Sequence, residues 1–73
     1  MNWRERIVSD PQILRGKPCI KDTRIPVALI LGYLAAGRDT AAIQREFPDL
    51  TESDVAACLG YARHLAEFEA APA

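Results

Sequence analysis

The sequence is poor in the residue types on which most metal sites depend. It has one histidine and two cysteines in 73 residues, and Cys19 and Cys58 do not form a C-x-x-C pair. A structural zinc ion takes four ligands, so a site made from Cys19, Cys58 and His64 would lack one. Free cysteine otherwise behaves as a small apolar residue. We therefore interpret both cysteines as buried thiols of a reducing compartment and expect no metal or other cofactor.

The features of an enzyme are equally scarce. A nucleophile needs an activating base and a group that orients it, and His64 is the one histidine. The segment GKPCIKDTRIPV, residues 16–27, contains a single glycine and two prolines that cannot donate backbone hydrogen bonds. It therefore does not fit a phosphate-binding loop. Three neighbouring acids, Asp49, Glu52 and Asp54, are better explained as caps of a helix than as a metal site. We expect that the protein is not an enzyme.

Long apolar runs are also missing. No stretch approaches the ~20 apolar residues of a membrane-spanning helix, and MNWRERIVSD lacks the apolar segment of a signal peptide. These absences predict a cytoplasmic protein without membrane contact. The composition, 49% apolar and 26% charged, is typical of a globular domain. We predict a single domain, residues 1–73, with an extended or hairpin unit (1–25), three helices (26–69) and a frayed tail (70–73).

A chain this short has a thin core, which typically supplies only about 3–5 kcal/mol. We therefore expect self-association, and a homodimer is the simplest form. Charge is unevenly distributed: six basic and three acidic residues precede residue 25, and three basic and seven acidic residues follow it. This asymmetry favours an anionic partner at the N-terminal unit, although the charge is small. The alternative is that both halves carry ordinary solvated surfaces.

The sequence of the N-terminal unit predicts short extended segments. ERIVSDP predicts a strand that ends at Asp10-Pro11. Ile20 and Ile25 flank the polar tip KDTR, which predicts a tight reversal. Asp22 can occupy a left-handed turn position, though glycine would do so at lower cost. We interpret residues 16–27 as a folding device rather than a ligand loop.

We predict specific contacts for two side chains of that reversal. Thr23 should bond to local backbone. For Arg24 two roles are open: it pairs with a carboxylate or a helix C-terminus of the domain, or it projects toward a phosphate or a partner.

Helix signals follow. VALILGYLAA, residues 27–36, is apolar nearly all round, which predicts a helix that is covered on most sides and ends at Gly37. Asp39 is placed to cap a short second helix that Pro48 stops. Thr51 and Asp54 form a variant of the capping box at the start of a third helix, residues 52–69. Its predicted core stripe contains Val55, Cys58, Leu59, Ala62, Leu65 and Ala66.

The predicted fold is therefore mainly α, a short N-terminal β-hairpin or extended unit followed by a three-helix, helix-turn-helix-like bundle. A recognition helix presents its N-terminal residues to base edges, and here these are Glu52, Ser53 and Asp54, which phosphates would repel. If DNA is bound, the basic N-terminal unit is the better surface. The residues predicted to contact DNA are Arg15, Lys17, Lys21 and Arg24.

Several motifs together resemble a known family. The pattern G-K-P-x-I-x-x-T-R-I-x-V, from Gly16 to Val27, is continued by Phe47-Pro48, Leu50-Thr51 and Asp54-Val55. These residues are similar to the domain of unknown function 433, whose bacterial and archaeal members are regarded as VapB-like antitoxins. The resemblance spans about residues 6–65. Asp22 departs from it, because the family usually has glycine there.

The resemblance implies a homeodomain-like, helix-turn-helix-like fold and the role of an antitoxin. Such an antitoxin neutralises a PIN-like ribonuclease encoded beside it and represses its own promoter as a dimer. We place the toxin contact on the last helix, at Tyr61, Arg63, Leu65 and Phe68. Trp3 is interpreted either as a loosely ordered end or as an apolar anchor against a second subunit. The alternative function is a stand-alone DNA-binding regulator, or an orphan dimeric module, with no toxin.

Overall fold

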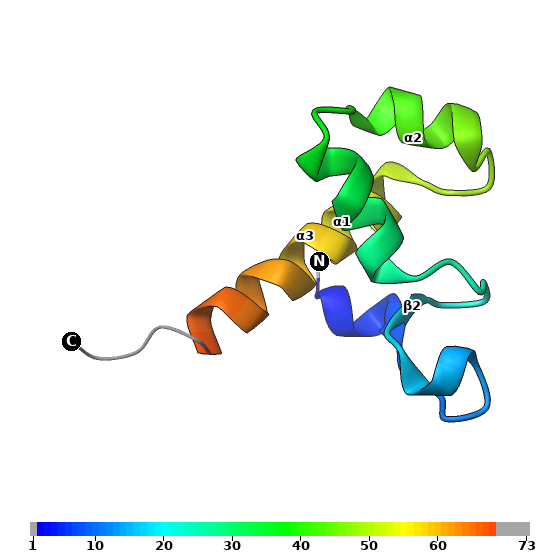
Figure 1. The fold of residues 1–73 in the computed structure, drawn as a ribbon, viewed down its shortest axis with the longest axis vertical. Helices are drawn as coiled ribbons and strands as arrows, with labels where there is room; N and C mark the ends of the chain where they lie inside the picture. Colours follow the sequence, from blue (N-terminus) through cyan, green and yellow to red (C-terminus); the bar gives the residue numbers. More distant parts are fainter. Residues whose placement is uncertain (1, 69–73) are drawn as a thin grey trace.

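The chain folds into a small β unit followed by three helices (Figure 1). The computed structural model describes residues 2–68, with side chains up to Glu67. The predicted frayed tail, residues 70–73, and the side chain of Phe68 lie outside the described residues. The elements in chain order are the 3-10 turn η1 (Trp3–Glu5), β1 (Ile7–Val8), the turn η2 (Leu14–Gly16), β2 (Cys19–Ile20), α1 (Val27–Ala35), α2 (Thr40–Glu46) and α3 (Glu52–Phe68). This order confirms the predicted fold class.

The β unit is an antiparallel pair in which Ile7 lies opposite Ile20 and Val8 opposite Cys19. The predicted reversal after β2 is confirmed, since the Ile20 N–H donates to the Ile25 carbonyl at 3.0 Å. Thr23 bonds to local backbone as expected: its hydroxyl donates to the Ile20 carbonyl at 2.7 Å and accepts from the Ile25 N–H at 3.0 Å. The turn is thus held by its own side chain as well as by backbone bonds.

Left-handed backbone occurs at two places in this unit. Asp22 has a φ of 63°, as the sequence predicts. The second place was not predicted: Leu14, Arg15 and Gly16 have φ values of 50°, 57° and 84° in succession. Each non-glycine residue in this region costs about 1–2 kcal/mol. Hydrogen bonds from the Gly16 and Lys17 N–H groups, at 3.0 and 3.1 Å, hold the turn in place.

Helix ends follow the predicted signals. Gly37, with a φ of 88°, ends α1 in a Schellman motif, because its N–H donates to the Leu34 carbonyl and the next N–H donates to Tyr33. The Asp39 carboxylate accepts from the Ala42 N–H at 2.8 Å and caps α2. These three bonds accompany the sharp change of direction between α1 and α2 in Figure 1.

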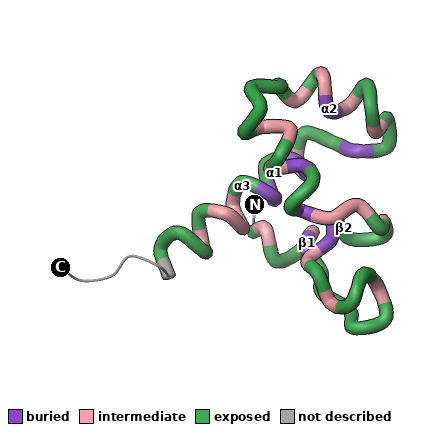
Figure 2. Tube along the Cα trace, in the orientation of Figure 1, coloured by how far each residue is buried: buried purple, intermediate pink, exposed green. Residues whose placement is uncertain are grey.

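The core lies where the three helices meet the β unit (Figure 2). It has no side chain larger than isoleucine or leucine among its fully buried members, and partly buried aromatic rings close its edges. The buried residues are Ile7, Cys19, Ile20, Val27, Ile30, Ile43, Leu50, Val55, Ala57 and Cys58, together with the polar Asp54.

Two predictions about burial are wrong. In α1 only Val27 and Ile30 are buried, and Leu29 is 42% exposed, so the helix is not covered on most sides. In α3 the predicted core stripe is buried at Val55 and Cys58, but Leu59 and Leu65 are 50% and 43% exposed. Leu29 and Leu59 each lie next to a fully buried residue, Ile30 and Cys58, so they are exposed because they are on the outer side of their helices. For Leu65 the reason is length: at 1.5 Å per residue α1 is about 14 Å long and α3 about 25 Å, so the far half of α3 projects beyond the body of the domain (Figure 1).

Candidate functional site

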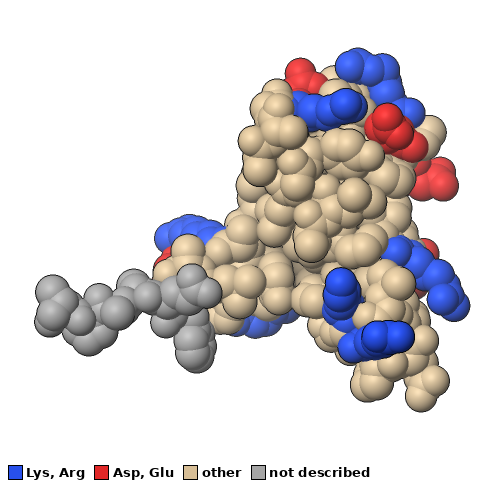
Figure 3. All heavy atoms as spheres, viewed as in Figure 1, with Lys and Arg blue, Asp and Glu red and all other residues tan. Residues whose placement is uncertain are grey.

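Charged side chains are segregated on the surface. Figure 3 shows Lys and Arg side chains over the β unit, a mixture of basic and acidic side chains over α2, and an uncharged face over α1 between them. The sequence of α1, VALILGYLA, contains no charged residue. The protein therefore offers two chemically different surfaces, one basic and one apolar.

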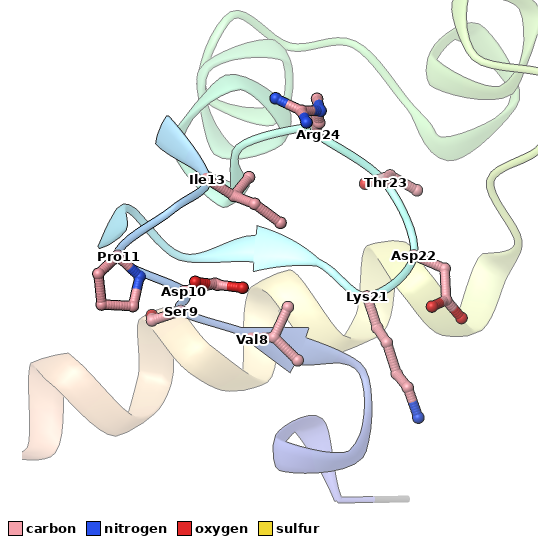
Figure 4. A pocket seen from close by; sticks show the side chains of 9 residues that line it. All are labelled: Val8, Ser9, Asp10, Pro11, Ile13, Lys21, Asp22, Thr23 and Arg24. Carbon is pink, nitrogen blue, oxygen red and sulfur yellow. The ribbon is translucent and has the colours of Figure 1, made fainter. Parts of the chain in front are cut away.

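The basic surface includes an open cleft of about 900 Å³ on the β unit (Figure 4). Val8 and Ile13 form apolar walls, and the turn of residues 21–24 forms the opposite rim. The Lys21 and Arg24 side chains leave this turn on opposite sides. Asp10 and Asp22 also line the cleft, so its charge is mixed. A polyanion would contact the rim rather than enter the cleft.

The four predicted DNA contacts are all exposed, but they are not gathered at one point. Arg15 lies on the left-handed turn. Lys17 borders a different groove, described below. Lys21 also borders a small polar hollow that contains Glu5 and Asp54. Within residues 2–67, Arg24 makes no ion pair and no side-chain hydrogen bond. Among the described residues the structure therefore does not show the pairing expected in one of its two roles, and its exposure agrees with the other, that it projects outward.

The apolar surface contains a groove of about 290 Å³ between α1, α3 and the two prolines that flank β2. Two predicted partner contacts, Tyr61 and Leu65, lie in it. Of its lining residues only Lys17 is charged. The described residues that line it are Lys17, Pro18, Pro26, Val27, Ala28, Leu31, Tyr61 and Leu65.

Trp3 has a role that the sequence did not indicate. Its ring packs edge-on against Tyr61, with ring centroids 5.2 Å apart, and lies 5.3 Å from His64. Gly60 permits the approach, because a Cβ at that position would lie 3.2 Å from the Trp3 Cβ. Trp3 is thus an anchor against its own α3 and not a loose end. His64 is likewise half-buried beside this ring rather than facing water.

Arg63 does not share the groove with Tyr61 and Leu65. It lines a separate hollow with Trp3 and Glu67, and its Nε lies 2.9 Å from a Glu67 carboxylate oxygen. Both side chains are largely exposed, and such pairs contribute little to stability. The predicted partner contacts therefore divide between two sides of α3.

A buried carboxylate links the β unit to α3, and the sequence analysis missed its partner. Asp54 is 8% exposed, and its Oδ1 lies 3.1 Å from Nη1 of Arg6. The predicted capping box is present: Oδ2 accepts from the Thr51 N–H at 3.0 Å, and the Asp54 N–H donates to the Thr51 hydroxyl at 3.1 Å. Nothing local could reveal the ion pair, since its residues are 48 positions apart.

Cys58 lies one turn further along α3 and is fully buried. Burial, and to a smaller extent the negative charge of Asp54, raises the pKa of the Cys58 thiol to about 11. The thiol is therefore protonated at neutral pH, which makes it a poor nucleophile. Cys19 is also a buried cysteine with a free thiol. In the described part of the chain no group of three or more His, Cys, Asp or Glu side chains could hold a metal ion.

The β unit, the capped start of α3 and the groove residues other than Leu65 fall in the region that matches a known family. The family model described as protein of unknown function (DUF433) matches residues 7–62. The chain belongs to the DUF433 family. The match begins at β1 and ends within α3, so Trp3, Arg63 and Leu65 lie outside the region that defines this family. No curated protein and no solved structure gives a significant match. None of the helices in the described part of the chain has the length and apolar character needed to cross a membrane.

Proposed function

We propose that this DUF433 protein is the antitoxin of a type II toxin–antitoxin system. In this proposal it neutralises a PIN-like ribonuclease and binds operator DNA as a dimer. The observation that carries the proposal is the segregation of surfaces on one small chain. A basic β unit suits the phosphates of DNA, whereas a largely apolar groove between α1 and α3, lined by Lys17 and seven uncharged residues, suits a protein partner.

The geometry favours the β unit over α3 as the DNA surface. The acidic start of α3 is engaged inside the domain, because Asp54 is buried and bonded to Arg6 and Thr51. Glu52 in the same turn is exposed and negative, so this end of the helix repels a phosphate backbone. Arg15 and Arg24, by contrast, are exposed on the β unit.

The first test is co-purification. The native operon is expressed with this protein tagged, and proteins recovered in stoichiometric amount are identified by mass spectrometry. A partner of nuclease size that loses its RNA-cleaving activity in the complex is the expected result. If the tagged protein is recovered without a partner, the antitoxin proposal is rejected.

A stand-alone DNA-binding regulator is the second candidate. Arg24, which is exposed and makes no ion pair within residues 2–67, favours it equally. This candidate predicts salt-sensitive binding to the protein's own promoter without any protein partner. Recovery of the protein alone together with promoter binding would support this candidate.

Replacing Arg24 with glutamate is expected to weaken promoter binding about tenfold or more at ~100 mM salt and to lower the salt slope by about one, because a phosphate contact is lost. Fluorescence anisotropy over a salt series measures both quantities. Arg45→Glu, which makes the same charge change at an exposed position of α2, is the matched control. Equal binding by the two variants would show that the β unit is not the DNA surface.

A further inference from the structure

We propose that the left-handed turn of residues 14–16 enters the minor groove of A·T-rich duplex DNA, with Arg15 as the inserted cation and Leu14 as an apolar contact beside it. The inference rests on the DNA half of the function proposed above and deepens it, because it names the element, the groove and the base composition. It does not depend on a toxin.

The turn has a conformation that its own residues disfavour. Leu14 and Arg15 have φ values of 50° and 57°, in a region that glycine occupies at much lower cost. Neither side chain belongs to the core: Leu14 is 39% exposed, and Arg15 is exposed. Conformations of this kind cluster at binding and catalytic sites. The fold gains little from these two side chains, which points to contact with a partner.

The turn is held in one shape by local hydrogen bonds. The N–H groups of Gly16 and Lys17 donate to carbonyls three residues earlier, at 3.0 and 3.1 Å. Just before the turn, Asp10 accepts hydrogen bonds through its carboxylate and its carbonyl, at 2.9 and 2.8 Å. Figure 1 shows this segment at the outer edge of the β unit. A projecting tip that is already ordered loses little entropy on binding.

The charge of the tip suits an anion. Arg15 and Lys17 are exposed, and in the described part of the chain Arg15 makes no ion pair and no side-chain hydrogen bond. Asp10 is the one acidic residue between positions 10 and 17, and its carboxylate already accepts a backbone N–H. Arg24 lines the same cleft as Ile13, the residue directly before the turn. Basic groups therefore outnumber acidic ones around the tip, as the phosphates of DNA require.

The other elements do not suit the major groove. That groove is about 12 Å wide and is read by an α-helix or a two-stranded ribbon. β1 and β2 contain two residues each, about 7 Å of strand, which is too short for a ribbon. A recognition helix presents its first residues to the bases. No described helix begins with a basic residue: α1 starts Val-Ala-Leu, α2 Thr-Ala-Ala and α3 Glu-Ser-Asp.

The minor groove, in contrast, suits a tight turn. It is about 6 Å wide, so it excludes a helix but admits single side chains. A·T-rich tracts have a narrower minor groove with a stronger negative potential, which attracts arginine. Proteins that bind there also insert apolar side chains such as leucine at the base steps. Leu14 and Arg15 supply both groups from adjacent positions, and Lys17 is left to contact the flanking phosphates.

Fluorescence anisotropy of the full chain with three duplexes of about 20 base pairs tests the inference. The central base pairs are A·T in one duplex, G·C in the second and inosine·cytosine (I·C) in the third. An I·C pair lacks the guanine N2 amino group, so it presents the minor groove of A·T and the major groove of G·C. We expect the A·T and I·C duplexes to bind at least ~10-fold more tightly than the G·C duplex at ~100 mM salt.

Three variants locate the contact. Arg15→Gly should keep the fold, because glycine adopts a φ of 57° without penalty, and should reduce the preference for A·T over G·C to less than ~twofold. Leu14→Ala should weaken binding to the A·T duplex about fivefold and leave G·C binding unchanged. Arg45→Ala is the matched control, because it removes an exposed arginine of α2 and should keep the preference. Circular dichroism checks that each variant is folded.

An I·C duplex that binds no more tightly than the G·C duplex would overturn the groove assignment and leave the DNA-binding proposal standing. A preference that survives in Arg15→Gly would equally reject the turn as the contact. If that variant instead loses capture of the nuclease, the turn belongs to the protein partner. A wild type that binds none of the three duplexes rejects the inference, and binding to its own promoter then decides the DNA half of the proposed function separately.

Discussion

Replacing Asp54 with alanine is expected to lower the free energy of unfolding by about 2–4 kcal/mol. The carboxylate accepts two hydrogen bonds, from the Thr51 N–H and from Arg6, so the substitution removes half of a capping box and a partly buried ion pair. Loss of a cap costs about 1 kcal/mol. Removing one partner of a buried pair costs about 3–5 kcal/mol, but Arg6 keeps 40% of its side-chain exposure and can be rehydrated, which brings the total down.

Urea unfolding followed by circular dichroism measures this effect. Asp39→Ala is the matched control, because Asp39 caps α2 through one bond and has no ion pair among the described residues. It should cost only about 1 kcal/mol. The Arg6→Ala variant and the Arg6→Ala/Asp54→Ala double variant complete a double-mutant cycle. Additive losses in that cycle would show that the ion pair contributes nothing. If Asp54→Ala lowers the free energy of unfolding no more than Asp39→Ala does, Asp54 acts only as a helix cap.

Local chemistry made much of this fold predictable. The left-handed conformation of Asp22, the helix stop at Gly37 and the caps at Asp39 and Thr51 all depend on residues within a few positions of one another. Each was predicted and is confirmed. The family resemblance was equally local, since it rests mainly on residues 16–27, and the DUF433 match confirms it.

Features that join distant residues could not be predicted in this way. The Arg6–Asp54 ion pair and the packing of Trp3 on Gly60 depend on how η1 docks against α3. The left-handed turn at Leu14 and Arg15 has no glycine at either position that would predict a positive φ. Tertiary contacts decide the first two features, whereas the turn is held by local hydrogen bonds from the Gly16 and Lys17 N–H groups.

The prediction of which helix residues are buried failed for a related reason. Periodicity placed Val55 and Cys58 on the buried face of α3, but it also placed Leu59 there, which is 50% exposed. It also could not say how far along the helix that face is covered. Cys58 and Leu65 belong to the same stripe, yet one is fully buried and the other is 43% exposed. The coverage depends on the length of α1. The same limit explains α1 itself: its uniform apolar sequence predicted that it is covered on most sides, whereas the described chain has too few elements to cover it.

Stability is expected to fall by about 2–3 kcal/mol between pH 9 and pH 11 through the titration of Cys58. Burial, with a smaller contribution from the charge of Asp54, raises the pKa of this thiol from 9.0 to about 11 in the folded chain. Between those values the folded state binds more protons at Cys58 than the unfolded state does, so the free energy of unfolding decreases as pH rises. The contribution is complete below pH 9 and is lost by the time the pH passes 11.

Thermal or urea unfolding at several pH values from 8 to 11 measures this loss, and Cys58→Ala isolates it. Lysine and tyrosine side chains titrate in the same range, so the informative quantity is the difference in unfolding free energy between wild type and variant. That difference should shrink by about 2–3 kcal/mol across the window and can change sign, because the variant carries only a constant cavity cost. Curves that stay parallel from pH 8 to pH 11 would contradict the assignment. Because Cys58 and Asp54 lie on the same face of α3, Asp54→Ala should leave most of the effect in place, since burial remains the dominant cause.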